Sequence, residues 1–446
     1  MSSASQNAAS DAGLRRQLTA GQMAMVGVGG SIGTGLLLGS GAAVRIAGPA
    51  VILSFAAAAL ITWTVTMALG EMASLHPSAG SFGTYAELYL NPWAGFISRY
   101  GYWMAIAIAI GGELVASATY MHYWFPGVHA IVWIVLFAAG LIAINLRTVG
   151  DYGRFQYWFA MIKLVTIVAF IVLGAGLLLT RRVQPQYTAA GGFFSNGPSA
   201  PLLAMSFSLF TFAGIEMVAI SSGESRSRQE IPRAVRLTFG LLTLVYMGAI
   251  VVLVGVMPWN GTGVTESPFV TVFRHVGLPA ASHLMNFVVL SAALSGANAS
   301  LYVDSRTLFS LARSGYAPSA LAKLTAAGAP LRALLVSAFG IVVAVIMEKW
   351  APEDAFVYLL GAALFGAMLA WLVALAAHVR FRARWAPEQL ASLPMRSPGG
   401  ATASIVGFIA IAASLAATWW YSRVTVLSGV VYIVGLSAAY LLARAK

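Results

Sequence analysis

Three ionisable side chains, Glu113, Lys163 and Glu216, lie inside long apolar stretches of the sequence. A charge in such a setting is costly unless it is paired, protonated or exposed to a water-filled cavity. Two interpretations meet that condition. One is a buried structural ion pair, and the other is a group that binds and releases a proton during a working cycle. A lysine suits the second role because burial favours its neutral form.

Two apolar stretches are interrupted by glycine. Residues 27–35 contain five glycines, and residues 210–216 combine Gly214 with the acid Glu216. Close packing between helices would explain the first stretch alone, since Gly29 and Gly33 have small-xxx-small spacing. Paired interruptions at matching places in two halves of a chain indicate instead an inverted-repeat transporter with its site at mid-membrane. Free N–H groups and carbonyls at such breaks suit a zwitterion.

Residues 29–33 also match the G-x-S-x-G pattern of a serine hydrolase. That motif requires a preceding strand and His and Asp partners, whereas here it lies within a charge-free span. No phosphate-binding loop ends in Gly-Lys-Ser/Thr. The chain contains no cysteine, so we expect no thiolate metal site. Since neither motif has the context that its chemistry needs, we also expect no cofactor and no enzyme activity.

The surrounding composition places these residues in lipid. Of 446 residues, 59% are hydrophobic and 9% charged, against about 25% charged in a soluble domain. A bilayer core of about 30 Å needs about 20 apolar residues of helix. Twelve stretches approach that length: 23–44, 49–70, 99–124, 127–146, 156–179, 199–221, 237–257, 281–303, 332–347, 355–377, 401–421 and 424–443.

The distribution of basic residues predicts the orientation. With the N-terminus inside, 19 Lys and Arg fall on cytoplasmic segments and 6 on the opposite face. The net charge of +12 therefore reflects topology rather than a nucleic-acid surface. We expect a disordered cytoplasmic segment at 1–19, a ten-helix core at 20–385 with halves 20–180 and 199–385, and two further helices at 386–446.

Several other ionisable residues have a plainer explanation. Acids at the cytoplasmic span ends lie among arginines and are expected to form salt bridges: Glu71, Glu87, Asp151, Glu224 and Asp304. His283 and His378 are expected to be satisfied or interfacial rather than proton relays.

Motifs along most of the chain, from about residue 18 to 384, resemble the amino acid permease family within the amino acid–polyamine–organocation superfamily. The matching segments are 29–35, 39–41, 68–73, 112–114, 155–163, 214–216, 223–224, 257–259 and 288–295. Two segments depart from the family pattern. Ala213 replaces a glycine, which would narrow the pocket, and residues 225–228 lack the usual proline after Gly-Glu.

The resemblance implies an all-α membrane protein with a LeuT-type five-plus-five inverted repeat and two extra helices. It implies symport of an amino acid with protons across the cytoplasmic membrane. Ser31, Gly33, Thr34 and Gly35 would contact the substrate from the first broken helix. Phe210, Phe212 and Ala213 would do so from the sixth, with the Phe210 ring as a gate.

The same resemblance suggests coupling residues. Lys163 would replace a sodium ion, Glu216 would take part in gating, and Glu113 matches the third-span glutamate of aromatic amino acid permeases. Because the spans hold few acids, we expect a neutral substrate, aliphatic or aromatic. An exchanger remains the alternative, and a channel or receptor is a further one. The sequence does not indicate the oligomeric state.

Overall fold

The computed structural model describes residues 17–78, 80–146, 152–189, 191–313, 315–325, 329–420 and 422–444. The side chains of residues 152–157, 424, 443 and 444 are not described. Of the segment expected at 1–19, residues 1–16 therefore lie outside these ranges. Arg147, Asp151 and the side chain of Arg154 also lie outside.

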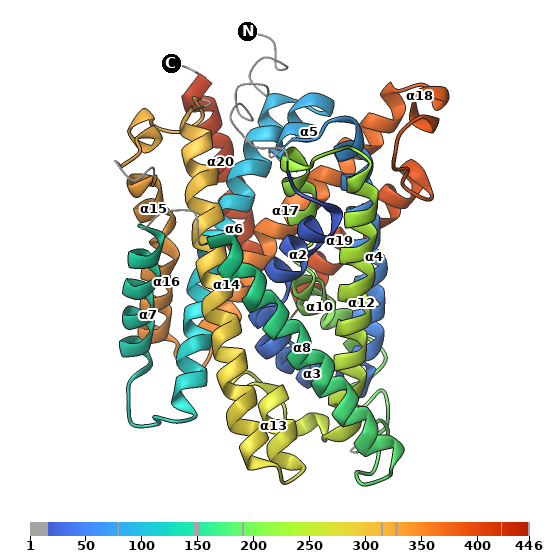
Figure 1. Ribbon diagram of the computed structural model, residues 1–446, viewed down its shortest axis with the longest axis vertical. Coiled ribbons are helices and arrows are strands. Elements are labelled where there is room, and N and C mark those ends of the chain that lie inside the picture. The colour runs from blue at the N-terminus through green and yellow to red at the C-terminus, as the bar shows by residue number, and fades with distance from the viewer. Residues whose placement is uncertain are drawn as a thin grey trace.

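Helices account for most of the described chain, and they cross the molecule as a bundle (Figure 1). Within these ranges, the β structure consists of one isolated bridge between Leu18 and Ser225. The helices are α2 Ala20–Ser31, η1 Gly35–Gly39, α3 Ser40–Ala47, η2 Gly48–Ala50, α4 Val51–Leu75, α5 Ser81–Tyr89, α6 Pro92–His122, α7 Ala130–Asn145, α8 Tyr152–Leu179, α9 Ala200–Leu203, α10 Met205–Thr211, α11 Met217–Ile220, η4 Ser221–Glu224, α12 Glu230–Val256, η5 Trp259–Gly261, α13 Pro268–His275, α14 Pro279–Arg313, η6 Ser319–Ala322, α15 Leu331–Ser337, α16 Phe339–Trp350, α17 Ala355–Arg384, α18 Pro387–Ala391, α19 Gly400–Thr418 and α20 Arg423–Arg444.

Nine helical runs in the described part are long and apolar enough to cross a membrane. Helix is the expected state, because a backbone in hydrocarbon must satisfy its own hydrogen bonds. Eight of the runs coincide with expected spans, and the ninth, Gly35–Leu75, joins the end of the first expected span to the second. The expected span 127–146 contains the shorter apolar helix α7. The remaining one, 199–221, is broken into α9, α10 and α11.

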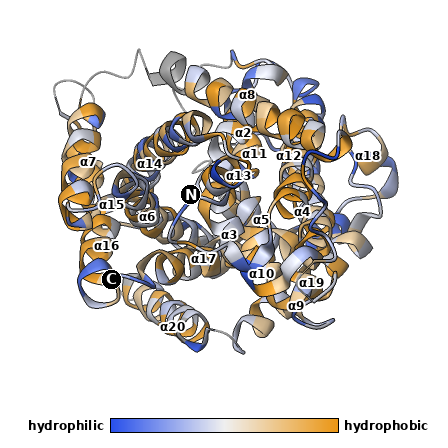
Figure 2. Cartoon of the chain, turned by 90° about the horizontal axis from the view of Figure 1, so that it is seen from below, coloured by the Kyte–Doolittle hydropathy of each residue, from blue (hydrophilic) through white to orange (hydrophobic). Residues whose placement is uncertain are grey.

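The outer surface of the bundle carries large apolar side chains. Leu60, Leu244 and Trp350 are each at least 70% exposed. Figure 2 shows hydrophobic residues along peripheral helices such as α7, α12 and α16. Such a surface is unstable in water and stable in lipid. The chain is therefore a multi-pass membrane protein.

The interior of the bundle is organised around α6 and α17. These two helices pack on one another, and α6 also packs against α14 and α16. Small residues permit close approach. A Cβ at Gly366 would lie 2.7 Å from the carbonyl oxygen of Gly101. The packed pair of α6 and α17 forms the part of the bundle that lies beside the interrupted segments.

A buried ionic cluster joins three helices. Glu71 on α4 accepts from His378 Nε2 at 2.9 Å and from Arg382 Nη2 at 2.8 Å, both on α17. It also accepts from the backbone N–H of Ser397 at 3.0 Å, and His378 Nδ1 contacts Ser404 Oγ of α19 at 2.7 Å. The prediction that Glu71 forms a salt bridge is confirmed, and so is the prediction that the ring nitrogens of His378 have hydrogen-bond partners. Glu87 likewise pairs with Arg99 at 2.7 Å.

Candidate functional site

The first interruption lies between α2 and η1. Helix α2 ends at Ser31, and Ile32 adopts an extended backbone conformation with φ −79° and ψ 93°. Helical structure resumes at Gly35 and runs through η1 into α3. The Ser31 hydroxyl donates to its own helix at Gly27 O, 2.9 Å away. The glycine-rich segment therefore breaks the helix, as the sequence predicted.

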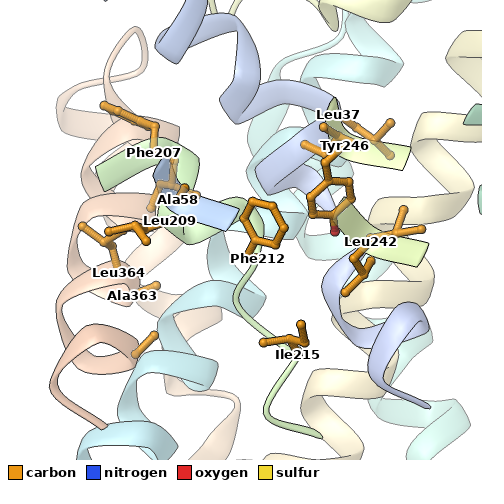
Figure 3. Packing of buried hydrophobic residues seen from close by; sticks show 14 of the residues in the cluster. Leu37, Ala58, Phe207, Leu209, Phe212, Ile215, Leu242, Tyr246, Ala363 and Leu364 are labelled. Atoms are coloured by element: carbon orange, nitrogen blue, oxygen red, sulfur yellow. The ribbon is translucent and has the colours of Figure 1, made fainter. Parts of the chain in front are cut away.

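The second interruption follows α10. Residues 212–216 form turns between Thr211 and the short helix α11. Gly214 has φ +100°, which an L side chain rarely adopts. Both oxygens of the Glu216 carboxylate accept from the Gly214 N–H, at 3.1 and 3.0 Å. Figure 3 shows the chain running as a coil from Phe212 to Ile215.

The two interruptions lie against each other. A Cβ at Gly214 would come within 2.7 Å of the carbonyl carbon and oxygen of Gly30. The Thr211 hydroxyl shares its proton between Phe207 O of its own helix, at 3.0 Å, and Gly35 O of the other segment, at 3.3 Å. Glycine at position 214 lets the two backbones approach this closely, because a Cβ there would collide with the Gly30 carbonyl.

A small cavity of about 80 Å³ opens between the interruptions. At about 10–15 Å³ per water position, this volume is the size of a handful of water molecules. Its lining combines both breaks with α6, α14 and α17: Gly30, Ser31, Gly33, Gly35, Tyr102, Ala105, Ile106, Ala109, Glu113, Phe210, Ala213, Gly214, Glu216, Met217, Ser300, Ala363 and Ala367. The lining thus combines two acids and three hydroxyl-bearing residues with glycines and apolar side chains.

Opposite charges bracket the first break. The Lys163 ammonium, 2% exposed on α8, donates to Ile32 O at 3.0 Å. The carboxylate of Glu113 on α6 accepts from the Thr34 N–H at 3.3 Å. A cation thus meets the C-terminal end of α2 and an anion meets the N-terminal end of the next helical run, which is the arrangement that helix dipoles favour. Glu113 and Lys163 also interact electrostatically.

Glu216 is held from three sides. Besides the Gly214 N–H, it accepts from Trp371 Nε1 of α17 at 3.2 Å. The Tyr102 phenol of α6 lies beside the carboxyl group. The sequence did not single out Trp371 or Tyr102, because helical spacing does not show which face of α17 or α6 meets the break.

The structure brings most of the predicted site residues together. Ser31, Gly33, Gly35, Phe210 and Ala213 line the cavity. Thr34 contributes its N–H to Glu113. Phe212 is fully buried and points away into the core, where its ring meets Tyr246 at 5.0 Å (Figure 3). Of the predicted coupling residues, Glu113 and Glu216 line the cavity and Lys163 lies behind the first break.

The predicted salt bridge of Asp304 is wrong. Asp304 on α14 is fully buried, and neither carboxyl oxygen has a hydrogen-bond partner among the described residues. The adjacent Arg306 donates instead to Tyr302 O and stacks on the Tyr302 ring. Two positions apart on a helix, the side chains of 304 and 306 point in different directions. A nearby arginine in the sequence therefore did not mean an ion pair for Asp304 in the structure.

Comparison with known proteins gives a consistent result. The family described as Amino acid permease matches residues 22–443. The gamma-aminobutyric acid permease of Bacillus subtilis (strain 168) is 36% identical over 380 residues, covering 84% of this chain and 81% of that protein. The aromatic amino acid transport protein AroP of Escherichia coli (strain K12) is 36% identical over 375 residues, covering 83% and 82%.

A solved structure shares the fold. The Eremococcus coleocola manganese transporter superimposes with a TM-score of 0.61 at 13% identity, covering 95% of this chain and 92% of that one. Among the described residues here, no three His, Asp or Glu side chains gather as a metal site. Because the match to the family extends over almost the whole sequence, the chain belongs to the amino acid permease family, whose members are transporters rather than enzymes.

Proposed function

We propose that the protein imports a neutral amino acid together with a proton across the cytoplasmic membrane by alternating access. The observation that carries this proposal is the pair of helix breaks facing each other across one cavity. Interrupted helices at a mid-membrane cavity are the characteristic binding site of inverted-repeat transporters.

The substrate would bind as a zwitterion between the breaks. Its carboxylate would meet the first-turn N–H groups of the helical run that begins at Gly35, where the dipole is positive. Its ammonium would meet the carbonyls of Phe210 and Ala213, since a carbonyl can accept two hydrogen bonds. Ser31 and Gly33 would border the zwitterion, with Thr34 and Phe212 supporting the breaks and the Phe210 ring closing the cavity.

A substrate without net charge agrees with the cavity lining and with the substrates in the relatives' names. Apart from Glu113 and Glu216, the lining residues carry no charge: they are glycines, apolar side chains and the hydroxyl-bearing Ser31, Tyr102 and Ser300. Both acids already accept hydrogen bonds from the protein. The relatives' names refer to gamma-aminobutyric acid and to aromatic amino acids, which carry no net charge as zwitterions.

Proton coupling would rest on the charged groups around the breaks. Lys163 holds Ile32 O in this conformation through its ammonium. Loss of a proton would free α2 to move relative to α8. Glu113 and Glu216 are each hydrogen bonded to one of the breaks. These hydrogen bonds would change as the substrate binds or leaves.

The architecture proposed for this cycle has twelve crossings. Residues 20–180 and 199–385 would form the two inverted five-helix halves, and residues 386–446 the two additional helices. The distribution of Lys and Arg would place both termini in the cytoplasm.

The test is uptake into proteoliposomes with an imposed pH gradient, after a thermal-shift screen of the common amino acids has identified a ligand. We expect accumulation that follows the gradient and that is lost in Lys163→Met, which keeps the apolar stem without the charge. Lys349→Met, at an exposed position on α16, is the matched control. Gradient-independent uptake that survives Lys163→Met would refute proton coupling.

The exchanger alternative predicts that uptake requires internal substrate. Empty and preloaded vesicles separate the two mechanisms directly. The channel alternative predicts current without accumulation against a gradient.

A further inference from the structure

We propose that Asp304 is a proton-binding carboxyl group of the transport cycle, holding a proton in the conformation described here and releasing it when the cytoplasmic side opens. This inference rests on the proposed function, because it assigns a residue to the proton pathway of that symport. It concerns a group outside the substrate cavity.

The surroundings of Asp304 indicate that it is uncharged here. Its exposed fraction is 0%, and both carboxyl oxygens lack hydrogen-bond partners within the described residues. The Ser337 hydroxyl of α15 lies beside it; this hydroxyl accepts the Trp103 indole N–H at 3.0 Å and keeps one O–H of its own to donate. One neutral hydroxyl does not replace a counter-ion, and an ionised carboxylate without a counter-ion is far more costly to bury than its neutral acid.

The titratable neighbours cannot neutralise a negative charge. Tyr102 of α6 and Tyr432 of α20 interact electrostatically with Asp304, and a neutral phenol supplies no positive charge. On α14 itself, Arg306 is held at Tyr302. Lys163 of α8 is held at Ile32. Within the described ranges, no Lys, Arg or His forms an ion pair with Asp304.

The position of Asp304 connects the cavity with one end of the bundle. Ser300, four residues earlier on the same face of α14, lines the cavity. From Asp304 to the last residue of α14, Arg313, nine residues span roughly 14 Å of helix. This end carries Arg306 and Arg313, and the basic-residue rule assigns it to the cytoplasm.

Tyr102 provides the link between the cavity and Asp304. It lines the cavity beside Glu216 and interacts electrostatically with both acids. In the conformation described here the phenol does not hydrogen bond to Asp304, so the transfer would take place in another conformation of the cycle that brings the two groups into contact. There, with Glu216 protonated and Asp304 ionised, the phenol would accept a proton from Glu216 while it donates its own to Asp304. The O–H bond of Asp304 later breaks, and its proton leaves to cytoplasmic water. Each transfer leaves the phenol neutral and conserves charge.

The experiment compares net transport with exchange in proteoliposomes. Asp304→Asn mimics the protonated acid and cannot release a proton. With a tritiated mixture of the common L-amino acids, we expect substrate exchange between preloaded vesicles and medium to stay within about twofold of the unmodified protein. Accumulation driven by a pH gradient should fall by at least about tenfold, in keeping with the usual contribution of a positioned proton-transfer group. Asp304→Glu should restore accumulation with an altered pH profile, and Asp354→Asn, at an exposed position, should change neither.

Four outcomes contradict the proposal. If Asp304→Asn accumulates substrate normally, the carboxyl group is structural. If it folds but loses exchange as well, the residue serves a step other than proton release. If neither Asp304→Asn nor Asp304→Ser yields folded protein by thermal melting, the acid belongs to the fold. If the unmodified protein ignores the pH gradient, proton symport fails, and with it the assignment of Asp304; the first three outcomes leave symport standing.

Discussion

Gly214 illustrates how a single residue sets the geometry of the site. Its positive φ turns the chain after α10, and the missing Cβ lets it touch the Gly30 carbonyl. A left-handed conformation costs a non-glycine residue about 1–2 kcal/mol. A methyl group at position 214 would also push the two breaks apart, because it would collide with the Gly30 carbonyl.

We therefore expect Gly214→Ala to lower the melting temperature and to abolish binding of the ligand found in the thermal-shift screen. Gly240→Ala on α12 is the matched control, because a Cβ there meets nothing within 4 Å. In a helix interior, this control should gain roughly 0.5–1 kcal/mol of stability. Normal ligand binding by Gly214→Ala would show that the contact between the breaks is dispensable.

His76, just beyond the end of α4, makes stability depend on pH. Burial and the nearby positive charge of Arg228 lower the pKa of His76 below 6.5. In the neutral form its Nε2 contacts the Tyr89 hydroxyl at 2.7 Å. Below pH 6.5 the unfolded chain binds this proton more readily than the folded protein does, so the free energy of unfolding decreases as the pH falls.

Thermal melting in detergent at pH 7 and at about pH 5.5 tests this effect. The unmodified protein should lose more stability on acidification than His76→Gln, which cannot titrate. His275→Gln replaces an exposed histidine and should behave like the unmodified protein. Equal acid sensitivity in all three proteins would contradict the prediction.

At the scale of elements, the Glu71 cluster connects α4, α17 and α19. Removing one member of a buried ion pair leaves the others uncompensated and typically costs about 3–5 kcal/mol. We expect Glu71→Gln to lower the melting temperature strongly. Glu266→Gln, which breaks the partly exposed pair with Arg274, should change stability by less than about 1 kcal/mol. Equal effects of the two variants would show that burial does not strengthen the Glu71 cluster.

The elements also show how far sequence reasoning extends. Apolar length predicted where the long helices lie, and glycine together with a buried acid predicted the two interruptions. These features are local, so composition and spacing suffice to reveal them. Which side chain faces which neighbour depends on packing between distant segments. The sequence therefore did not show that the Phe212 ring packs on Tyr246 in the core, it predicted a salt bridge for Asp304 that does not form, and it did not reveal Trp371 and Tyr102.

At the scale of the whole molecule, the ends of the bundle differ in what they present. Helices α5 and α18 lie at one end of the bundle and α13 at the other (Figure 1). The first end carries Arg382 and Arg384 in the last turn of α17, and the basic-residue rule predicts that this end faces the cytoplasm. The chain contains no cysteine, so a single introduced cysteine reports on one position without background.

Ser392, between α18 and α19, and Asn260, within η5 near α13, are both exposed. In intact cells, a membrane-impermeant maleimide should label Asn260→Cys and should label Ser392→Cys only after permeabilisation. The cysteine-free parent controls for background, and labelling after denaturation controls for expression. The reverse pattern would invert the topology, placing the Glu71 cluster on the external side. It would also put the α14 end of the Asp304 pathway outside the cell, where a proton released in an import cycle could not leave with the substrate.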